Sequence, residues 1–317
     1  MPSGLVPDAE VRISDDLVSR LLAAQHPDLA SLPLGERHEG WDNVTVRIGH
    51  DLAARLPRRR VGADLASREH AWLPTLAADW DFAVPTPVRL GEPGEGYPWS
   101  WSIVPYHPGE RAFDAPLTDA GAKDLGKALA QVHREAPSGA PRNPVRSAPL
   151  AARAEVFDAR INTLLDAAKD DPSRPVLLED AARAAFEAGA RAPQGQETWA
   201  HLDLHGGNVL SERGRLAAVL DWGDLGVGDP ATDLGQALTL VGRRGFRVLV
   251  DAYAKAGGAA ARRGTLLTSG SLREDTALRV EAEAVGYAVT LACFERAIHP
   301  YAGWSALVDL GYATPRD

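Results

Sequence analysis

Apolar residues near the start of the chain recur at helical spacing, and several short apolar runs follow them. In the segment 15–25, Leu17, Leu21 and Leu22 fall on one face of a helix. Turn signals such as the glycine at position 49 then separate short runs that have the pattern of strands. The predicted strands cover residues 43–48, 52–56, 88–90 and 101–105, and one further helix is predicted over residues 63–79.

Past a stretch rich in proline and glycine, the pattern becomes mainly helical. Leu125, Leu129 and Val132 have helical spacing behind Thr118, a candidate N-cap. One strand-like island interrupts this part at residues 199–222. Further helices are predicted over residues 151–168, 176–189, 229–240, 246–257 and 274–298. The order of predicted strands and helices therefore indicates an α+β fold with an N-terminal lobe (1–103), a hinge (104–109) and a larger, mainly helical C-terminal lobe (110–317).

Composition narrows the class of protein. The 317 residues include 34 basic and 43 acidic side chains, and 45% hydrophobic residues is ordinary for a soluble globular protein. The net charge of −9 argues against nucleic acid or an anionic membrane as partner. Cys293 is the only cysteine, and Met1–Glu10 contains no apolar run of the kind that signal peptides carry. A cytoplasmic protein is expected, and its oligomeric state is not indicated.

The chemistry of the chain is concentrated in the strand-like island. The segment HLDLHGGN, which begins at His201, places Asp203 and Asn208 on either side of a Gly-Gly turn. Further on, Asp221 ends the apolar run 216–220. Carboxylate and amide oxygens suit Mg²⁺, and an Asp held apart from the metal can accept a proton from a hydroxyl. These residues predict a site for metal-assisted transfer.

The pattern H-x-D-x-x-x-x-N followed by a strand-ending Asp resembles the catalytic loop and metal-binding Asp of protein kinases. Three linked motifs, HLDLHGGN, LDWGD and GDPATDL, are more similar to those of the aminoglycoside phosphotransferase family, including its macrolide phosphotransferase-like members. The resemblance covers most of the chain and is strongest at residues 199–235. It implies a bilobal, protein-kinase-like α+β fold and a kinase that acts on small molecules.

The resemblance assigns roles to the polar residues of these motifs. Asp203 becomes the catalytic base, or the residue that orients the acceptor hydroxyl, and His201 braces the loop. Asn208 and Asp221 become ligands of Mg²⁺. The cofactors implied are Mg²⁺ and ATP or GTP, and the partners are a nucleotide and a small hydroxylated substrate.

Two aspartates of GDPATDL, Asp229 and Asp233, would hold the catalytic loop through hydrogen bonds under the same resemblance. Asp229 directly precedes Pro230, so it also fits the N-cap of a helix. The two roles are compatible, and both stay open at this point.

The N-terminal lobe departs from the usual kinase pattern, in which a strand lysine pairs with a helix glutamate. No lysine precedes Lys123. Arg55 in LAARLPRR has the matching position, and Glu69 is the expected carboxylate partner. Macrolide phosphotransferases similarly carry an arginine here. Arg is permanently charged and can bind phosphate oxygens in a bidentate manner, so Arg55 is predicted to bind the nucleotide phosphates.

The remaining nucleotide contacts are expected from a covering loop and from the hinge. Trp41 and Asn43, in EGWDN, are the loop candidates, and Ser102, Val104 and Tyr106 lie where the family's hinge would hold adenine. The nearby Trp99 and Trp101 are expected to pack in the core.

The acceptor is expected to be a hydroxyl of an aminoglycoside or macrolide antibiotic, with a small metabolic alcohol resembling choline or homoserine as the alternative. Candidate substrate contacts are Asp224, Glu295, Tyr301 and Trp304. Two further hypotheses compete with the kinase. The alternation His201-x-Asp203-x-His205 is also found in zinc hydrolases, and a nucleotide-binding protein without transfer activity would also carry these motifs.

Overall fold

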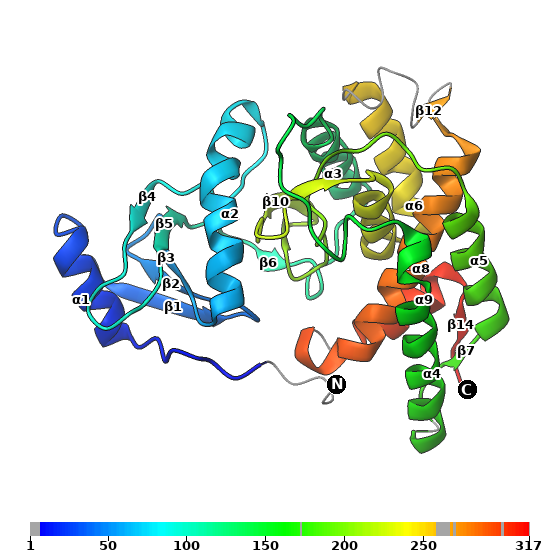
Figure 1. Ribbon diagram of the computed structural model, residues 1–317, viewed down its shortest axis with the longest axis horizontal. Coiled ribbons are helices and arrows are strands. Elements are labelled where there is room, and N and C mark those ends of the chain that lie inside the picture. The colour runs from blue at the N-terminus through cyan, green and yellow to red at the C-terminus, as the bar shows by residue number, and fades with distance from the viewer. Residues whose placement is uncertain (1–6, 172, 258–266, 269–270, 299–300, 317) are drawn as a thin grey trace. The chain divides into compact units, whose positions relative to one another are not determined.

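The computed structural model in Figure 1 describes residues 7–171, 173–257, 267–268, 271–298 and 301–316. It divides into two units, which are described one at a time. Residues 7–108 and 218–224 form the sheet unit. The described residues of 109–217 and 225–316 form the helical unit. Residues 218–224 thus group with the N-terminal part of the chain, although the sequence placed all of 110–317 in one lobe.

A five-stranded antiparallel sheet with the order β1-β2-β3-β5-β4 is the centre of the sheet unit. The strands are β1 (Leu34–Glu39), β2 (Asn43–Ile48), β3 (Leu52–Pro57), β4 (Arg89–Gly91) and β5 (Trp101–Pro105). Helix α1 (Asp15–Gln25) precedes the sheet, and α2 (Arg60–Leu76), extended by the 3₁₀ turn η1 (Ala77–Asp79), lies between β3 and β4 in the chain.

Alternation along the strands separates the two faces of this sheet. Val44 pairs with Leu56, and Ala54 pairs with Ile103, so these apolar side chains share one face. The same residues form a buried core with Leu21 and the other apolar residues of α1. Arg55, one position along from Ala54, therefore points to the opposite face, the one that α2 supplies with Glu69. Trp101 is fully buried in the α1-side core, as the sequence predicted.

The helical unit is built around two long helices, α6 (Ala231–Ala256) and α8 (Glu274–Ile298). Helix α8 contacts α4, α5, α6 and α9, and α3 packs on α6; Figure 1 shows this grouping. A side chain at Gly235 of α6 would collide with α8, so this glycine permits the close approach of the two helices. The other helices are α3 (Asp119–Val132), η2 (Leu150–Arg153), α4 (Ala154–Asp170), α5 (Glu179–Arg191) and α9 (Ala302–Leu310).

Short strands complete the helical unit. A three-stranded sheet has the order β10-β9-β6, and its hairpin turns at Arg213 and Gly214, which both have positive φ. That geometry matches the twist of the flanking strands. The strands are β6 (Glu110–Arg111), β7 (Val176–Leu177), β8 (Thr198–Ala200), β9 (Val209–Glu212), β10 (Arg215–Val219), β11 (Gly226–Gly228), β12 (Leu267–Thr268), β13 (Ser271–Leu272) and β14 (Ala313–Thr314).

The α+β class predicted from the sequence is confirmed, and most predicted elements are present. The helix predicted over 176–189 begins only at Glu179, because Val176 and Leu177 pair with β14 instead. The helices predicted over 229–240 and 246–257 are joined as α6 across a kink at Gly242, where φ is 65°. Strand β1 was not predicted, because only two of its six residues, Leu34 and Gly35, are not polar. Within the described ranges, no helix has the length and apolarity needed to cross a bilayer.

Candidate functional site

The loop at residues 201–208 is fixed from below by the first turn of α6. The carboxylate of Asp233 accepts hydrogen bonds of 2.7 Å from the backbone N–H groups of His201 and Leu202. Leu202 has a φ of 69°, a conformation that side chains other than glycine seldom adopt. Two bonds to one carboxylate hold the backbone in this unusual turn, and the turn presents the next residue, Asp203.

Asp233 is itself fully buried, and it is held as a carboxylate. Its Oδ2 accepts a hydrogen bond of 3.1 Å from Nε2 of His133, whose Nδ1 lies 2.9 Å from the hydroxyl of Tyr253. Burial raises the pKa of Asp233, but the hydrogen bond and charge of His133, with smaller contributions from His201, lower the pKa below its usual value on balance. The ionised group is therefore an acceptor for every donor around it.

Gln236 also holds the loop, a role that the sequence reasoning missed. Its Oε1 accepts a hydrogen bond of 2.7 Å from the backbone N–H of Leu204, and its Nε2 donates one of 3.0 Å to the carbonyl of Leu202. Gln236 follows Asp233 by three residues, so both lie on the same side of α6. That spacing within GDPATDLGQ was the signal that could have identified it.

Asp203 is surrounded by donors and remains 19% exposed. Its Oδ1 accepts a hydrogen bond of 3.0 Å from the hydroxyl of Tyr287 on α8, and it lies 2.7 Å from a guanidinium nitrogen of Arg146. Burial raises the pKa of Asp203, but the charge of Arg146, followed by those of His205 and His201, lowers it below the usual value on balance. Asp203 is thus an ionised, partly accessible carboxylate that can accept a hydrogen bond from a hydroxyl.

Neither Arg146 nor Tyr287 was among the predicted residues. Both are distant from the motif in the sequence, and neither belongs to a recognisable pattern. The position of Arg146 is set by a turn in which the Asn143 side chain accepts hydrogen bonds from the N–H groups of Val145 and Arg146, at 2.9 and 2.8 Å. The turn therefore fixes the backbone from which the guanidinium reaches Asp203.

Asn208 lies beside Asp203, as the spacing of the motif predicted. Its Nδ2 donates a hydrogen bond of 2.9 Å to the backbone carbonyl of Asp203. This bond does not use the carboxamide oxygen, which is the donor atom that Mg²⁺ prefers. On the other side of the loop, the ring of His205 stacks on that of Phe113, with 5.7 Å between the ring centroids.

The hypothesis of a zinc hydrolase requires a cluster of metal-ligating side chains around His201 and His205. His201 uses Nδ1 to accept the backbone N–H of Asp203, and His205 uses Nδ1 to accept that of Gly207. Across the residues that the structure describes, no group of three or more His, Cys, Asp or Glu side chains is arranged to hold a metal. The two imidazoles instead shape the backbone of the loop.

In the sheet unit, Arg55 lies between two carboxylates. One guanidinium nitrogen lies 2.5 and 2.6 Å from the two oxygens of Glu69, and the other lies 2.6 Å from Oδ1 of Asp221. Glu69 is almost fully buried, whereas the Asp221 side chain is 46% exposed. Burial lowers the pKa of Arg55, but the charges of Glu69 and Asp221 outweigh burial, so on balance the pKa is above its usual value. Arg55 is a fixed cation, and Glu69 sets its position, as the sequence predicted for this pair.

Asp221 has the donor atoms and the exposure that a metal ligand requires. It follows β10 with a φ of 58°, a conformation that Asp tolerates better than most residues. Its Oδ1 is paired with Arg55, and its side chain is reachable from solvent. Carboxylate oxygens such as those of Asp221 suit Mg²⁺ rather than a softer metal.

The other predicted nucleotide contacts all belong to the sheet unit. Asn43 is buried at the start of β2, with its Oδ1 lacking a hydrogen bond to any described residue, and Trp41 precedes it in the connecting loop. Ser102 pairs across the sheet with Arg55. Val104 lies past the last residue of β5 that pairs with β4, and the backbone N–H of Tyr106 bonds to Asp51 at 2.8 Å.

The candidate substrate residues are scattered. Trp304 is 1% exposed within the core, which corrects its assignment as a substrate contact. Tyr301 is 70% exposed before α9, and Asp224 belongs to the sheet unit. The side chain of Glu295 lies outside the described residues.

Asp229 does not hold the loop as Asp233 does. Its Oδ1 accepts the backbone N–H of Ala231 at 2.9 Å, and its Oδ2 accepts from Nε of Arg279 at 2.6 Å. The side chain therefore caps the start of α6, although the N-cap position itself is occupied by Pro230.

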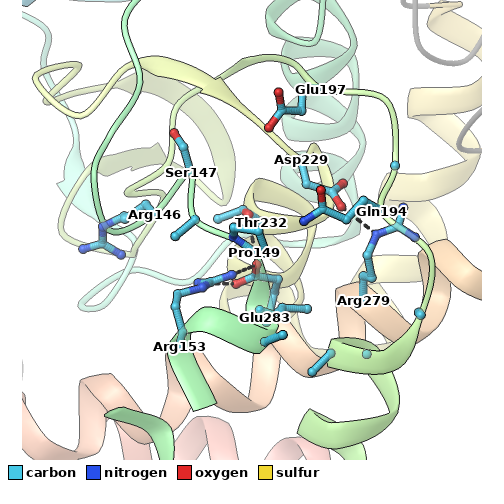
Figure 2. Close-up of a pocket in the computed structure, with 17 residues that line it drawn as sticks. Arg146, Ser147, Pro149, Arg153, Gln194, Glu197, Asp229, Thr232, Arg279 and Glu283 are labelled. Atoms are coloured by element: carbon cyan, nitrogen blue, oxygen red, sulfur yellow. Dashed lines mark hydrogen bonds and ion pairs between the residues drawn. The ribbon is translucent and has the colours of Figure 1, made fainter. Parts of the chain in front are cut away.

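The ion pair of Asp229 and Arg279 borders a cavity, drawn in Figure 2, that has a volume of about 40 Å³. Arg153 points to Glu283 and Arg279 points to Asp229, so these four charged side chains of its wall form two ion pairs. The hydroxyl of Thr232 also donates a hydrogen bond of 3.1 Å to Oε1 of Glu283. The volume is far below the several hundred Å³ typical of small-molecule sites. The contacts in its wall are instead structural: the Asp229–Arg279 pair and the hydrogen bond from Thr232 to Glu283 hold the start of α6 against α8.

Comparisons with known proteins identify the family and the fold of the chain. Residues 34–267 match the family model described as the phosphotransferase enzyme family. The fold is similar to that of aminoglycoside 2'-phosphotransferase-IIIa in its GDP complex, with a TM-score of 0.62, 19% identity, and coverage of 94% of this chain and 98% of that one. It is also similar to the macrolide 2'-phosphotransferase MphH from Brachybacterium faecium, with a TM-score of 0.54, 24% identity, and coverage of 90% and 96%. A search of curated proteins finds no match.

Proposed function

The chain belongs to the phosphotransferase enzyme family, and from this premise we propose that it transfers the γ-phosphoryl group of ATP or GTP to a hydroxyl of a small molecule. The observation that carries the proposal is the ionised carboxylate of Asp203 in a loop whose backbone is held by Asp233. The GDP complex of a structural neighbour supports a nucleotide as donor.

In this proposal the acceptor hydroxyl donates a hydrogen bond to Asp203. As the hydroxyl oxygen forms a bond to the γ-phosphorus, the bond from that phosphorus to the bridging oxygen breaks and the nucleoside diphosphate leaves. The hydroxyl proton passes to Asp203. Because the pKa of Asp203 is lowered, the carboxylate mainly orients the hydroxyl and takes the proton late, when the attacking oxygen has become acidic.

Arg55 is proposed to bind phosphate oxygens of the nucleotide, with Glu69 holding its guanidinium in place. Asn208 and Asp221 are proposed to hold Mg²⁺, which when bound neutralises charge on the phosphates. Trp41 and Asn43 remain the proposed contacts in the loop that covers the phosphates, and Ser102, Val104 and Tyr106 remain the proposed contacts of the nucleotide base.

The acceptor proposed from the sequence is an aminoglycoside or macrolide hydroxyl, and the structural neighbours of those names support that class. A small metabolic alcohol is the second candidate. One observation favours it, namely the arginine beside Asp203, because aminoglycosides are themselves polycations.

The test is release of nucleoside diphosphate from ATP or GTP with pooled hydroxyl compounds, with mass spectrometry to detect a phosphorylated product. Asp203→Ala should lower turnover by about 10²–10⁴-fold, the contribution of a positioned general base. Asp166→Ala is the matched control, because Asp166 is an exposed aspartate of the same unit that pairs with Lys169 at the surface. Equal activity of the two variants would contradict the role of Asp203.

A further inference from the structure

Three arginines of the helical unit contact α8 close to Asp203. The guanidinium of Arg146 lies over the ring of Tyr287, 5.5 Å from its centroid. Arg153 forms an ion pair with Glu283. A guanidinium nitrogen of Arg160, on α4, donates a hydrogen bond of 2.7 Å to Oγ1 of Thr290. We call Arg146, Arg153 and Arg160 the arginine row.

Their partners on α8 form a single face of that helix. Glu283, Tyr287 and Thr290 are spaced by four and three residues, which places their side chains on the same side. The hydroxyl of Tyr287, the middle residue of this face, contacts the candidate catalytic carboxylate of Asp203. Thr290 lies three residues further along, about 4.5 Å at the rise of an α-helix. Arg160 is therefore bonded to α8 about one helical turn from the residue that contacts Asp203.

The three arginines along this face outnumber the carboxylates that they pair with. Arg146 is paired with Asp203 and Arg153 with Glu283. Arg160 is partly buried, and among the described residues it pairs with no carboxylate, since Thr290 offers only a neutral hydroxyl. Burial lowers the pKa of Arg160, and the nearby charges of Arg146 and Arg153 lower it further, while Cys293 opposes them. A partly buried cation beside two others is a site that an anion would stabilise.

Building on the proposed phosphotransferase function, we propose that the acceptor is a small alcohol that carries a carboxylate or phosphate group, and that this anionic group binds Arg160. The acceptor hydroxyl then lies at Asp203, whose partner Tyr287 is three residues from Thr290, the partner of Arg160, on the same face of α8. Neighbouring positions on one helix face suit a small alcohol whose anionic group is a few bonds from the hydroxyl. The same arrangement favours an anionic alcohol over a polycationic aminoglycoside, because Arg160 would repel a cation and has no carboxylate partner among the described residues.

The experiment uses three alcohols with a common three-carbon skeleton and different charge: D-glycerate, glycerol and 3-amino-1,2-propanediol. Each is titrated at constant ionic strength against the full chain saturated with a non-hydrolysable ATP analogue and Mg²⁺. Binding to the folded state is read as a rise in Tm, because a ligand that binds only the native protein stabilises it. Glycerate should give a saturable rise, and the other two compounds should give little.

Substitutions of Arg160 test whether this residue binds the anionic group of the ligand. Arg160→Gln should weaken the apparent affinity for glycerate on the order of tenfold, the value of one hydrogen bond between charged groups. Arg160→Lys keeps the charge and should keep most of the response. Arg191→Gln is the matched control, because Arg191 is an exposed arginine of the same unit that pairs with Glu187. Comparing ligand-induced shifts, rather than Tm values, removes any general effect of a substitution on stability.

The proposal is overturned if glycerate gives no rise in the unmodified protein, if Arg160→Gln responds as Arg191→Gln does, or if the aminodiol binds as well as glycerate. Failure of the proposed function has a different signature. In that case the ATP analogue with Mg²⁺ itself gives no rise in Tm, while the comparison of the three alcohols can still be read without nucleotide.

Discussion

Oδ1 of Asp233 accepts a 2.7 Å hydrogen bond from the backbone N–H of Leu202, a residue whose φ of 69° is unfavourable for a branched side chain. The same carboxylate is fully buried and also accepts from His201 and His133. Asp233→Asn replaces one acceptor oxygen with an NH₂ group that would face a donor. We expect it to lower the free energy of unfolding by about 3 kcal/mol, as when one partner of a buried charged pair is removed.

Urea denaturation monitored by tryptophan fluorescence measures this change. Asp251→Asn is the control, because Asp251 lies on the same helix, is exposed and pairs with the exposed Lys255. It should change the free energy of unfolding by less than about 0.5 kcal/mol. A loss of similar size in both variants would mean that Asp233 does not stabilise the loop in the way its hydrogen bonds indicate.

The linked motifs allowed the catalytic loop and the aspartate that holds it to be predicted from the sequence, but not the side chains that surround Asp203. Asp203, Asn208 and Asp233 share a short stretch of chain, so the spacing that defines the motif also determines their hydrogen bonds. Arg146 and Tyr287 reach Asp203 from segments far away in the sequence, and only tertiary packing brings them there. Trp304 was misassigned for a related reason: an aromatic residue near a proposed site has the same sequence signal whether it faces a ligand or the core.

The pair of Arg55 and Glu69 could be predicted because the sequence has matching positions for the kinase pattern in which a helix glutamate holds a strand cation. Arg55→Ala removes the cation proposed to bind nucleotide phosphates, so the KM for nucleotide should rise and turnover should fall. The expected loss in kcat/KM is on the order of 10²-fold, equivalent to a charge-assisted contact of nearly 3 kcal/mol. Steady-state kinetics with varied nucleotide give both constants.

Arg89→Ala is the control for that experiment, because Arg89 is an arginine of the same sheet whose partner, Asp28, is at the surface. Arg55→Lys should recover part of the activity, since it keeps the charge but cannot contact Glu69 and a phosphate with separate nitrogens. If Arg55→Ala has the kinetics of Arg89→Ala, another residue binds the phosphates.

His70, next to Glu69 on α2, should make stability depend on pH. Burial, aided by the charge of Arg55, lowers the pKa of His70 to about 4 from the usual 6.5. Between these values the unfolded chain binds a proton that the folded chain does not, so stability rises with pH. The contribution of His70 is complete above pH 6.5 and is lost as the pH falls toward 4. His70→Gln should flatten this part of the curve of Tm against pH. NMR titration of the His70 ring provides a direct check, and a midpoint near 6.5 would contradict the prediction.

The roles proposed for Asp203 and Asp221 can be separated by their responses to Mg²⁺. Asp203 contacts Arg146 and Tyr287 and is proposed to meet the acceptor, so Asp203→Ala should reduce kcat with little change in nucleotide affinity. Asp221→Ala removes a proposed metal ligand and a partner of Arg55, so it should weaken the binding of nucleotide with Mg²⁺ and also reduce kcat. Asn208→Ala removes a neutral ligand, and added Mg²⁺ should partly restore its activity by mass action. The rate is measured against Mg²⁺ concentration for the three variants, with Asp166→Ala as the control. Recovery of Asp203→Ala at high Mg²⁺, or full activity of Asp221→Ala at low Mg²⁺, would show that the two carboxylates do not have these separate roles.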